Sequence, residues 1–346
     1  MRLVHDGAVL DPAAWTTTAR TGSMRIDDLV DAGSVLDLFA SGSTIVLQSM
    51  HRWWPPLTGF CRELELALGH HVQVNAYLTP AGAAGLSPHH DTHDVFVTQV
   101  TGSKRWVVRE PAVDAPLGRH RSDHARAAEQ PIVAQIELGP GDCLYLPRGY
   151  IHSATAQEAV SLHLTVGVLA STAHDVLRRL VDRAAEVPAF RRTLPPGLGS
   201  EVGVGERVVK ELLAELAEWL GTVDEHDLAD ELRARFWTRR RPLLAGQLLE
   251  LTTLDDLTDH SVVQRRSDIT CLLTTGPEEL EVVLGDRRLH LPAAVAAAVQ
   301  CLVDGEPHTV AELADRLDGP SRLVLVRRLV REGILVRLEA GSGDGP

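Results

Sequence analysis

The run from Pro88 to Asp94 gathers side chains that can bind a metal: it reads Pro-His-His-Asp-Thr-His-Asp. His89 and Asp91 are two residues apart, and side chains at that spacing point to the same face of an extended chain. Another histidine, His152, follows the run Pro147–Ile151 farther along the sequence. Two imidazoles and one carboxylate are the donor set of non-haem Fe(II) oxygenases, because three ligands on one face leave positions open for a chelating oxoacid and for dioxygen. The pattern therefore predicts a metal centre of His89, Asp91 and His152, and the lack of a thiolate disfavours structural zinc.

Other polar residues of the same run compete for the ligand role. A His-x-Asp pair is common among surface residues, so the spacing alone does not define a metal site. His90 is expected to point away from His89 on an extended chain. His93 and Asp94 could orient the ligands or begin the following strand, and we favour these roles over metal binding.

Two residues stand out because their types are rare in this chain. Asn occurs once, at Asn75, and Lys twice, at Lys104 and Lys210. A compact ammonium on a flexible stem suits one buried carboxylate, so we predict that Lys104 binds an anion rather than ending a strand in solvent. Asn75 lies inside a β-like run where Asn is a poor strand former, and a buried amide there needs a partner that a bound ligand would supply.

The residues between about 36 and 169 are rich in short β-like stretches separated by Gly and Pro. This pattern predicts an all-β barrel or sandwich. Lys104 is expected on a strand next to the one that follows His-x-Asp, beyond the turn Thr101–Ser103. The predicted strands are 44–48, 72–78, 95–100, 106–108, 132–136, 143–146 and 160–168, and one helix is predicted at 56–68.

The rest of the chain changes pattern twice. Three apolar stripes between residues 173 and 254 predict three helices, whose apolar faces need a partner in the β region or in a second subunit. Residues 289–338 then read as three helices and a strand, which resembles a winged helix-turn-helix. Thr309 with Glu312 suggests a capping box for one of these helices, Ser321 a cap for the next, and Gly333 the end of that helix.

Composition limits the class of protein. The chain has 346 residues and a net charge of −13, which argues against a broad nucleic-acid-binding surface. From Asp286 to Glu339 eight arginines face eight acidic residues, so the winged helix is predicted to be structural or to dock a protein. No apolar run approaches the roughly 18 residues of a membrane span. Four scattered cysteines and an amino terminus unlike a signal peptide indicate a cytoplasmic protein without disulfides.

Several motifs in order resemble the Jumonji-C (JmjC) ribosomal oxygenases of the cupin superfamily. The resemblance covers residues 44–168, with the helical and winged-helix regions following in the same order as in that family. The residues before Thr44 look short and divergent for the family. The motifs are Asn75–Gly82, Gly85–Asp91, Asp94–Gln99, Gly102–Trp106, Gly139–Gly149, His152 and Ser161–Thr165.

The resemblance implies an α+β chain: a double-stranded β-helix (cupin/JmjC) barrel in residues 1–170, a helical dimerisation bundle in 171–255 and a winged-helix domain in 256–346. It implies Fe(II) held by His89, Asp91 and His152. It also implies 2-oxoglutarate as cosubstrate, with Lys104 on its distal carboxylate. By the same resemblance Asn75 contacts the cosubstrate near the metal, and Tyr77 lines the same pocket.

The implied activity is hydroxylation of a protein side chain, typically of a ribosomal protein, by a homodimer. Three alternatives stay open. The substrate could be a peptide natural-product precursor, or the chain could be a catalytically silent metal-binding cupin with a regulatory winged helix. Demethylation of methyl-lysine would use the same metal site but needs a cage or groove for a methylammonium group. Trp53 and Trp54 fit a peptide-stacking role and a core role equally well.

Overall fold

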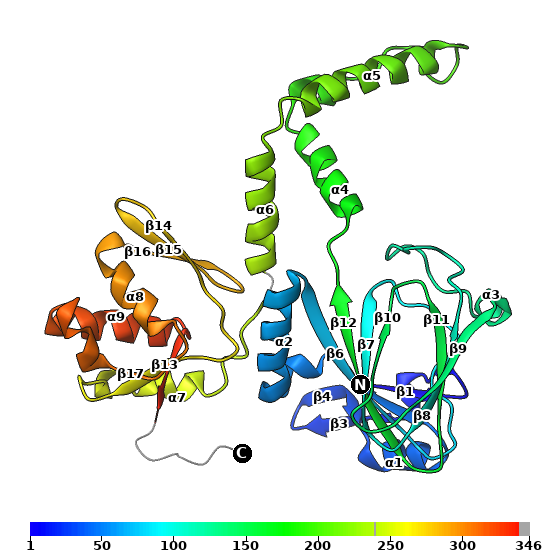
Figure 1. Ribbon diagram of the computed structural model, residues 1–346, viewed down its shortest axis with the longest axis horizontal. Coiled ribbons are helices and arrows are strands. Elements are labelled where there is room, and N and C mark those ends of the chain that lie inside the picture. Colours follow the sequence, from blue (N-terminus) through cyan, green and yellow to red (C-terminus); the bar gives the residue numbers. More distant parts are fainter. Residues whose placement is uncertain (239, 339–346) are drawn as a thin grey trace. The chain divides into compact units, whose positions relative to one another are not determined.

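The computed structural model describes residues 1–238 and 240–338 of the chain (Figure 1). It divides into two compact units, Met1–Ala170 and Ser171–Pro346. Each unit has hydrophobic clusters of its own. Over the described ranges, no helix combines the length and the apolar character that crossing a membrane would require.

Two antiparallel sheets form the first unit. The larger has seven strands in the order β10-β7-β12-β6-β5-β1-β2, and the smaller has three in the order β11-β8-β9. Apolar residues of β7 and β10 cluster with those of β8 and β9, so the two sheets pack face to face. The strands are β1 (Arg2–His5), β2 (Ala8–Val9), β5 (Thr44–Leu47), β6 (His71–Thr79), β7 (Asp94–Thr101), β8 (Lys104–Arg109), β9 (Ile132–Leu138), β10 (Cys143–Leu146), β11 (Ile151–Ala156) and β12 (Ser161–Leu169).

The strands and the helix predicted between residues 36 and 169 are confirmed, with ends that shift by at most two residues. The expectation that Lys104 lies on a strand next to the one that follows His-x-Asp is wrong. β7 belongs to the larger sheet and β8 to the smaller one, so these consecutive strands are not hydrogen-bonded neighbours. The chain crosses between the sheets at Gly102, which has φ +62°, and a Cβ there would lie 2.3 Å from the Val160 carbonyl oxygen. Only glycine fits this turn.

Several further elements of the first unit had no counterpart in the sequence analysis. An exposed hairpin, β3 paired with β4, stands apart from the two sheets. Besides the strands β1, β2 and β11 of the two sheets, the elements are β3 (Thr16–Thr21), β4 (Met24–Val30), α1 (Ala32–Ala40), α3 (His124–Glu129) and the 3₁₀ turns η1 (Pro12–Ala14) and η2 (Met50–Arg52).

Helix α2 (Pro55–Leu68) decides which face of β6 lines the barrel interior. Proline at the first helical position starts the helix, and Gly69 in the left-handed conformation ends it. Its buried residues Leu57 and Cys61 pack on Val72 and Val74 of β6. Because side chains alternate along a strand, the odd-numbered residues of β6 face the opposite side. They include Gln73, Asn75, Tyr77 and Thr79.

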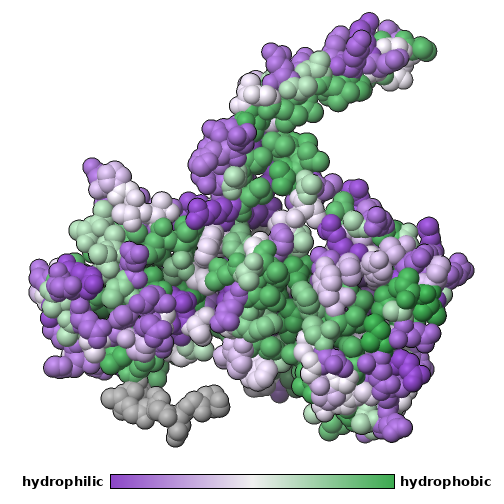
Figure 2. Space-filling model, viewed as in Figure 1, coloured by the Kyte–Doolittle hydropathy of each residue, from purple (hydrophilic) through white to green (hydrophobic). Residues whose placement is uncertain are grey.

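The second unit begins with the three predicted helices, α4 (Ala173–Ala184), α5 (Val204–Leu220) and α6 (Glu225–Trp237). A capping box of Thr172 and Asp175 starts α4. Arg183 joins α4 to α6 through a hydrogen bond from Nε to Glu231 Oε2 (3.2 Å). Apolar residues of α4 and α5 stay exposed, and Figure 2 shows them gathered over these two helices. They are Leu177, Val181, Val209 and Leu213.

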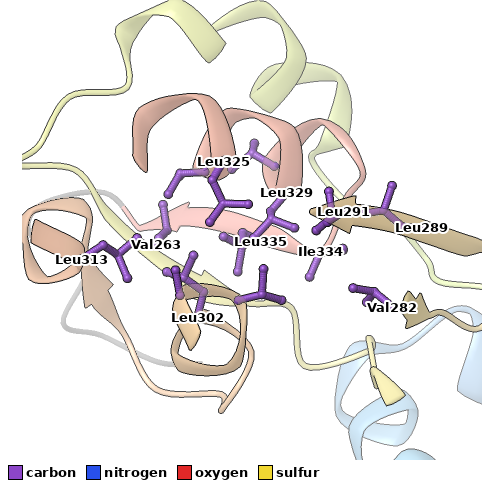
Figure 3. Packing of buried hydrophobic residues seen from close by; sticks show 14 of the residues in the cluster. Val263, Val282, Leu289, Leu291, Leu302, Leu313, Leu325, Leu329, Ile334 and Leu335 are labelled. Atoms are coloured by element: carbon purple, nitrogen blue, oxygen red, sulfur yellow. The ribbon is translucent and has the colours of Figure 1, made fainter. Parts of the chain in front are cut away.

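The remainder of this unit surrounds one large apolar core (Figure 3). Two three-stranded sheets, β17-β13-β18 and β14-β15-β16, and helix α9 supply most of the core. The elements are α7 (Gln247–Thr252), η4 (Leu254–Asp256), β13 (Val262–Arg265), β14 (Leu272–Thr275), β15 (Glu279–Val283), β16 (Arg288–Pro292), η5 (Ala293–Val295), α8 (Ala296–Leu302), β17 (His308–Thr309), η6 (Val310–Asp315), α9 (Gly319–Arg331) and β18 (Leu335–Leu338), whereas the 3₁₀ turn η3 (Pro188–Arg191) lies between α4 and α5 in the chain.

Two local predictions in this core are wrong. Residues 310–315 form a 3₁₀ helix, and the Thr309 hydroxyl donates to Glu312 Oε1 (3.0 Å) instead of capping a backbone N–H. Helix α9 begins at Gly319 and is capped by Asp318, whose carboxylate accepts from the Ser321 N–H (2.8 Å). Ser321 therefore lies in the first turn. A carboxylate also interacts favourably with the positive end of the helix dipole.

Candidate metal centre and adjoining pocket

The three residues predicted as metal ligands lie together. One ligand atom each from His89, Asp91 and His152 can be chosen so that all lie within 4.8 Å of one another, and among the described residues this is the one such group of three or more. The two imidazole rings lie 4.5 Å apart between centroids, and His152 Nε2 is 3.8 Å from Asp91 Oδ2. His152 is buried, whereas the other two are partly exposed, so the site opens on one side.

Backbone carbonyls fix the orientation of both imidazoles. His89 Nδ1 lies 2.8 Å from the Ser87 carbonyl oxygen, and His152 Nδ1 lies 3.1 Å from that of Tyr150. A carbonyl oxygen only accepts, so Nδ1 carries the proton in each ring and Nε2 keeps its lone pair for a metal. Burial, reinforced by the nearby His152, holds the pKa of His89 below its usual value, which favours the neutral ligand form.

The backbone also holds the two ligand segments in register. His89 and His152 exchange hydrogen bonds in both directions, from His89 N to His152 O (3.2 Å) and from His152 N to His89 O (2.8 Å). The Gly149 N–H donates to the Asp91 carbonyl (3.0 Å). Asp94 Oδ1 accepts from the Arg148 N–H (2.8 Å). The arrangement of the three ligands therefore comes from the fold itself.

The residues considered as rival ligands point elsewhere. His90 is buried and its Nε2 lies 3.1 Å from the His120 carbonyl oxygen. The carboxylate of Asp94 holds the loop that precedes His152, which is an orienting role. The His93 ring lies over Gly167 of β12, where a Cβ would come within 2.6 Å of it.

Lys104 is among the most deeply buried charged groups that the structure describes, at 1% exposure. Its Nζ donates to Thr79 Oγ1 (2.8 Å) and lies 3.3 Å from His163 Nδ1. Burial lowers the pKa of Lys104 to about 7, and no carboxylate contributes to it. A buried ammonium without a counter-ion is costly, so the site favours an anion that can supply one.

Aromatic rings connect the lysine to the metal ligands. The His163 ring stacks on Tyr77 at 4.8 Å and meets Trp106 edge-on at 5.3 Å, and Trp106 lies 6.0 Å from His152. Val108 of β8 pairs with His152 of β11, and Lys104 lies four residues before Val108 on the same strand. At the usual rise of a strand, the backbones of Lys104 and Val108 are therefore roughly 13 Å apart. The lysine stem covers part of this distance, and a short dicarboxylate could span the rest.

Asn75 has a protein partner that the sequence did not reveal. Its Oδ1 accepts from the backbone N–H of Ser49 (3.0 Å), a residue in the left-handed conformation. This bond engages the amide oxygen alone, so the contact of Asn75 with a cosubstrate oxygen, which the amide nitrogen would make, stays a prediction. The pKa of its strand neighbour Tyr77 is raised, by burial first and by the charge of Asp91 second, while Asn75 lowers it. Asn75 and Tyr77 thus lie side by side near the metal ligands.

Two further residues of the pocket were missed by sequence reasoning. Thr79 could have been found, because it continues the alternation of Asn75 and Tyr77 along one strand. Arg2 could not, because only the pairing of β1 with β5 brings it opposite Val46 and hence near Tyr77. Trp53 and Trp54 are exposed, at 76% and 51%, so they are not core residues.

The comparison with protein families agrees with this geometry. The family model described as JmjC domain matches residues 57–176. That segment contains the three candidate ligands and Lys104, and the barrel around it has the cupin-type JmjC architecture. Residues 57–176 therefore form a JmjC domain.

Within that class the chain is similar to ribosomal oxygenases. It is 32% identical over 250 residues to ribosomal oxygenase 2 of Bos taurus, covering 68% of this chain and 53% of that protein. It is 32% identical over 218 residues to the bifunctional lysine-specific demethylase and histidyl-hydroxylase NO66 of Dictyostelium discoideum, covering 57% and 42%. The chain spans about half the length of these two relatives. The resemblance seen in the sequence is confirmed.

Solved structures show the same fold. Escherichia coli YcfD aligns with a TM-score of 0.51 and 18% identity, covering 86% of this chain and 79% of that one. A second structure, of the YcfD ribosomal oxygenase in complex with cobalt and 2-oxoglutarate, aligns with a TM-score of 0.50 and 18% identity, covering 85% and 78%. At this identity the likeness supports the fold alone.

Proposed function

We propose that this chain is an Fe(II)- and 2-oxoglutarate-dependent oxygenase that hydroxylates a side chain of a protein, and that this protein is a ribosomal one. One observation carries the proposal: a single barrel holds both a two-histidine, one-carboxylate cluster and a buried ammonium that has no counter-ion among the residues that the structure describes. The cluster fits iron, and the ammonium fits the distal carboxylate of 2-oxoglutarate.

The donor set fits Fe(II) chemically. His89 and His152 offer neutral imidazoles with Nδ1 already engaged, and Asp91 supplies the one negative charge. Bound iron together with 2-oxoglutarate supplies an oxidant strong enough to hydroxylate an unactivated C–H bond. Asn75 and Tyr77 line the side of the pocket that lies next to Asp91.

The protein's own task is to position and shield the reactants. The Lys104 ammonium binds the distal carboxylate, and Thr79 and His163 hold that ammonium in place. Val95, Val97 and their apolar neighbours on β8 to β10 form an apolar layer between the two sheets. An apolar wall excludes water, which strengthens the electrostatic contacts inside and limits side reactions.

The relatives' names support a ribosomal target, and such a target would place the reaction in the cytoplasm. The test is mass spectrometry of ribosomal proteins from cells with the chain, without it, and with an Asp91→Ala variant. We expect one ribosomal peptide to gain the mass of one oxygen atom only with the intact chain. If no ribosomal peptide changes while the purified enzyme still consumes 2-oxoglutarate, hydroxylation of a peptide natural-product precursor becomes the leading function.

A silent metal-binding cupin is the less favoured alternative. Such a protein would be expected to have lost a ligand or the carboxylate anchor, and both remain in this chain. Measuring metal-dependent conversion of 2-oxoglutarate to succinate by the purified protein separates the two. Tight binding of 2-oxoglutarate with no turnover under any peptide pool would favour the silent protein.

We propose that α4 and α5 form a homodimer interface. Leu177 and Val181 on α4 are about as exposed, at 60% and 64%, as Leu213 on α5, at 60%. Leaving these aliphatic side chains in water is unfavourable, and a second copy would cover them. Light scattering at micromolar concentration should give a dimer mass for the wild type and a monomer mass for Leu213→Asp. Leu36→Asp, at a similarly exposed leucine of α1, is the matched control and should stay dimeric.

We propose three domains, a barrel to residue 170, a helical domain and a winged-helix domain at the C-terminus. Helix α7 packs with the last of these, since Gln247 Nε2 donates to the Val330 carbonyl (2.8 Å) of α9. The structure therefore favours starting the third domain at α7 rather than at residue 256. Its balanced charge favours a structural or protein-docking role over DNA binding. Fluorescence anisotropy with random duplex DNA at physiological salt tests this, and tight binding would contradict it.

A further inference from the structure

A second cation, on the first strand of the chain, stands on the face of the sheet that carries Tyr77 and His163. Arg2 on β1 pairs with Val46 on β5, Val46 pairs with Tyr77 on β6, and Tyr77 pairs with His163 on β12. Side chains directly opposite on neighbouring antiparallel strands stand on the same side of a sheet. Arg2 therefore stands on the side of the sheet that carries Tyr77 and His163.

The contacts of Arg2 leave one of its donors unused. Its guanidinium lies close enough to Tyr77 to lower the pKa of that phenol, whereas the charge of Asp91 raises it. Its Nε is buried and has no hydrogen-bond partner among the described residues. A buried N–H without a partner is costly, and an acceptor atom of a ligand would remove that cost.

The charges around this position oppose a cationic ligand. Arg2 and Lys104 are both basic, and Asp91 is the one carboxylate whose charge reaches Tyr77. Under the proposed function Asp91 is a metal ligand, so it would not serve as counter-ion to a substrate. The Tyr77 ring is stacked on His163 at an angle of 6°, and so one face of this ring is not free to enclose a methylammonium group.

We propose that Arg2 is a specificity residue, which donates a hydrogen bond to the target side chain and excludes cationic targets. The favoured class is an uncharged side chain with an acceptor atom, such as an imidazole or a carboxamide, and the disfavoured class is lysine, methyl-lysine and arginine. This inference rests on the proposed function and names its substrate class. It favours hydroxylation over lysine demethylation, the two activities that the name of the Dictyostelium relative combines.

The experiment uses pools of short peptides with one fixed central residue and randomised neighbours. The central residue is His, Asn, Gln, Lys, trimethyl-Lys or Arg. The full chain is loaded with Mn(II) and 2-oxoglutarate without oxygen, and retention of each pool is measured by mass spectrometry. We expect the uncharged pools to be retained at least about tenfold better than the cationic pools, because like charges at close range repel strongly in a partly buried site.

Variants of Arg2 separate a specificity role from a structural one. Arg2→Glu should retain the cationic pools better than the uncharged ones. Arg2→Met, which removes the charge, should bring the retention of the two classes to within about threefold of each other. Arg2→Lys should keep the exclusion of cationic pools, since the charge remains, which a purely structural role would not predict. Arg20→Met, at an exposed arginine of the β3–β4 hairpin, is the control and should keep the wild-type ratio.

Some outcomes would overturn the inference. One is that the wild type retains cationic and uncharged pools equally, and another is that it retains no pool. A third is that Arg2→Glu keeps the wild-type ratio of uncharged to cationic retention while its melting temperature is like that of the wild type. A parallel Fe(II) assay measures 2-oxoglutarate turnover without peptide. Loss of that turnover with the pool ratio intact would count against the proposed function and leave the role of Arg2 supported.

Discussion

The interior of the barrel and the core of the C-terminal unit are buried to a similar degree but are built from different side chains. The C-terminal core is aliphatic, with Leu302, Leu329 and Leu335 fully buried at its centre (Figure 3). In the barrel, the most buried residues include Lys104, Gln99 and His163. Burying aliphatic groups stabilises a fold, whereas burying an ammonium without a counter-ion destabilises it.

The difference separates a core that serves stability from one that serves binding. Val95, Val97 and Trp106 pack as an apolar cluster between the two sheets. Thr79 of β6 and His163 of β12, on the larger sheet, meet Lys104 of β8, on the smaller one. These buried polar residues lie beside Trp106, whose ring also contacts the candidate ligand His152, and this grouping indicates a site rather than a poorly packed core.

The largest effect is expected from the metal ligands. Asp91→Ala and His89→Ala should abolish 2-oxoglutarate turnover, because either change removes a ligand of the three-residue set. The fold should persist, since both residues are partly exposed and the barrel strands do not depend on their side chains. Succinate production and circular dichroism measure the two expectations. Asp37→Ala, at an exposed residue of α1, should behave like the wild type. Turnover in either ligand variant would show the ligand assignment to be wrong.

The next effect concerns the buried ammonium. Lys104→Met should weaken 2-oxoglutarate binding by about ten- to hundredfold, the usual contribution of a hydrogen bond to a charged group. Metal binding should persist because the three ligands are unchanged. Calorimetry with Mn(II)-loaded protein measures the affinity. The other lysine, Lys210, is exposed on α5, and Lys210→Met is the matched control. Equal affinity in the wild type and Lys104→Met would reject the anchor role.

In the C-terminal core the expected effect is on stability alone. Leu329→Ala should lower the free energy of unfolding of this unit by about 2–5 kcal/mol, the range for leucine truncation in a packed core. Urea denaturation measures the change. Val324→Ala on the same helix removes a 66% exposed side chain and should have little effect. The affinity for 2-oxoglutarate should stay unchanged in both variants, and a large loss in Leu329→Ala would show that the two regions are coupled.

The last effect is a pH dependence of stability without cosubstrate. The pKa of Lys104 falls from 10.5 to about 7 on folding, so the unfolded chain holds this proton between these two values and the folded chain does not. The free energy of unfolding of the wild type, relative to Lys104→Met, should therefore rise as the pH increases from 7 to 10.5. Below pH 7 the difference should be constant, with the variant the more stable of the two. Urea denaturation across this range measures both, and a flat difference would contradict the burial of a titrating ammonium.

The sequence predicted those parts of the site that local spacing determines. His89 and Asp91 share a face because of their spacing, and rarity drew attention to Lys104 and Asn75. What could not be predicted depends on pairing between distant strands. The placement of Lys104 on the opposite sheet follows from the crossing at Gly102, and the position of Arg2 follows from the register of β1 with β5. The Ser49 partner of Asn75 depends on a left-handed residue in a loop, for which the sequence has no glycine signal.

The reciprocal backbone hydrogen bonds between His89 and His152 have a consequence for how the protein acquires its ion. Because peptide groups hold the ligand segments in place, folding can be completed before any iron is encountered, and the ion can enter an assembled cavity. A chelator should then strip the protein without unfolding it, and adding Fe(II) back should restore it within the time of mixing. Such a protein can exchange its iron with the cellular supply throughout its lifetime.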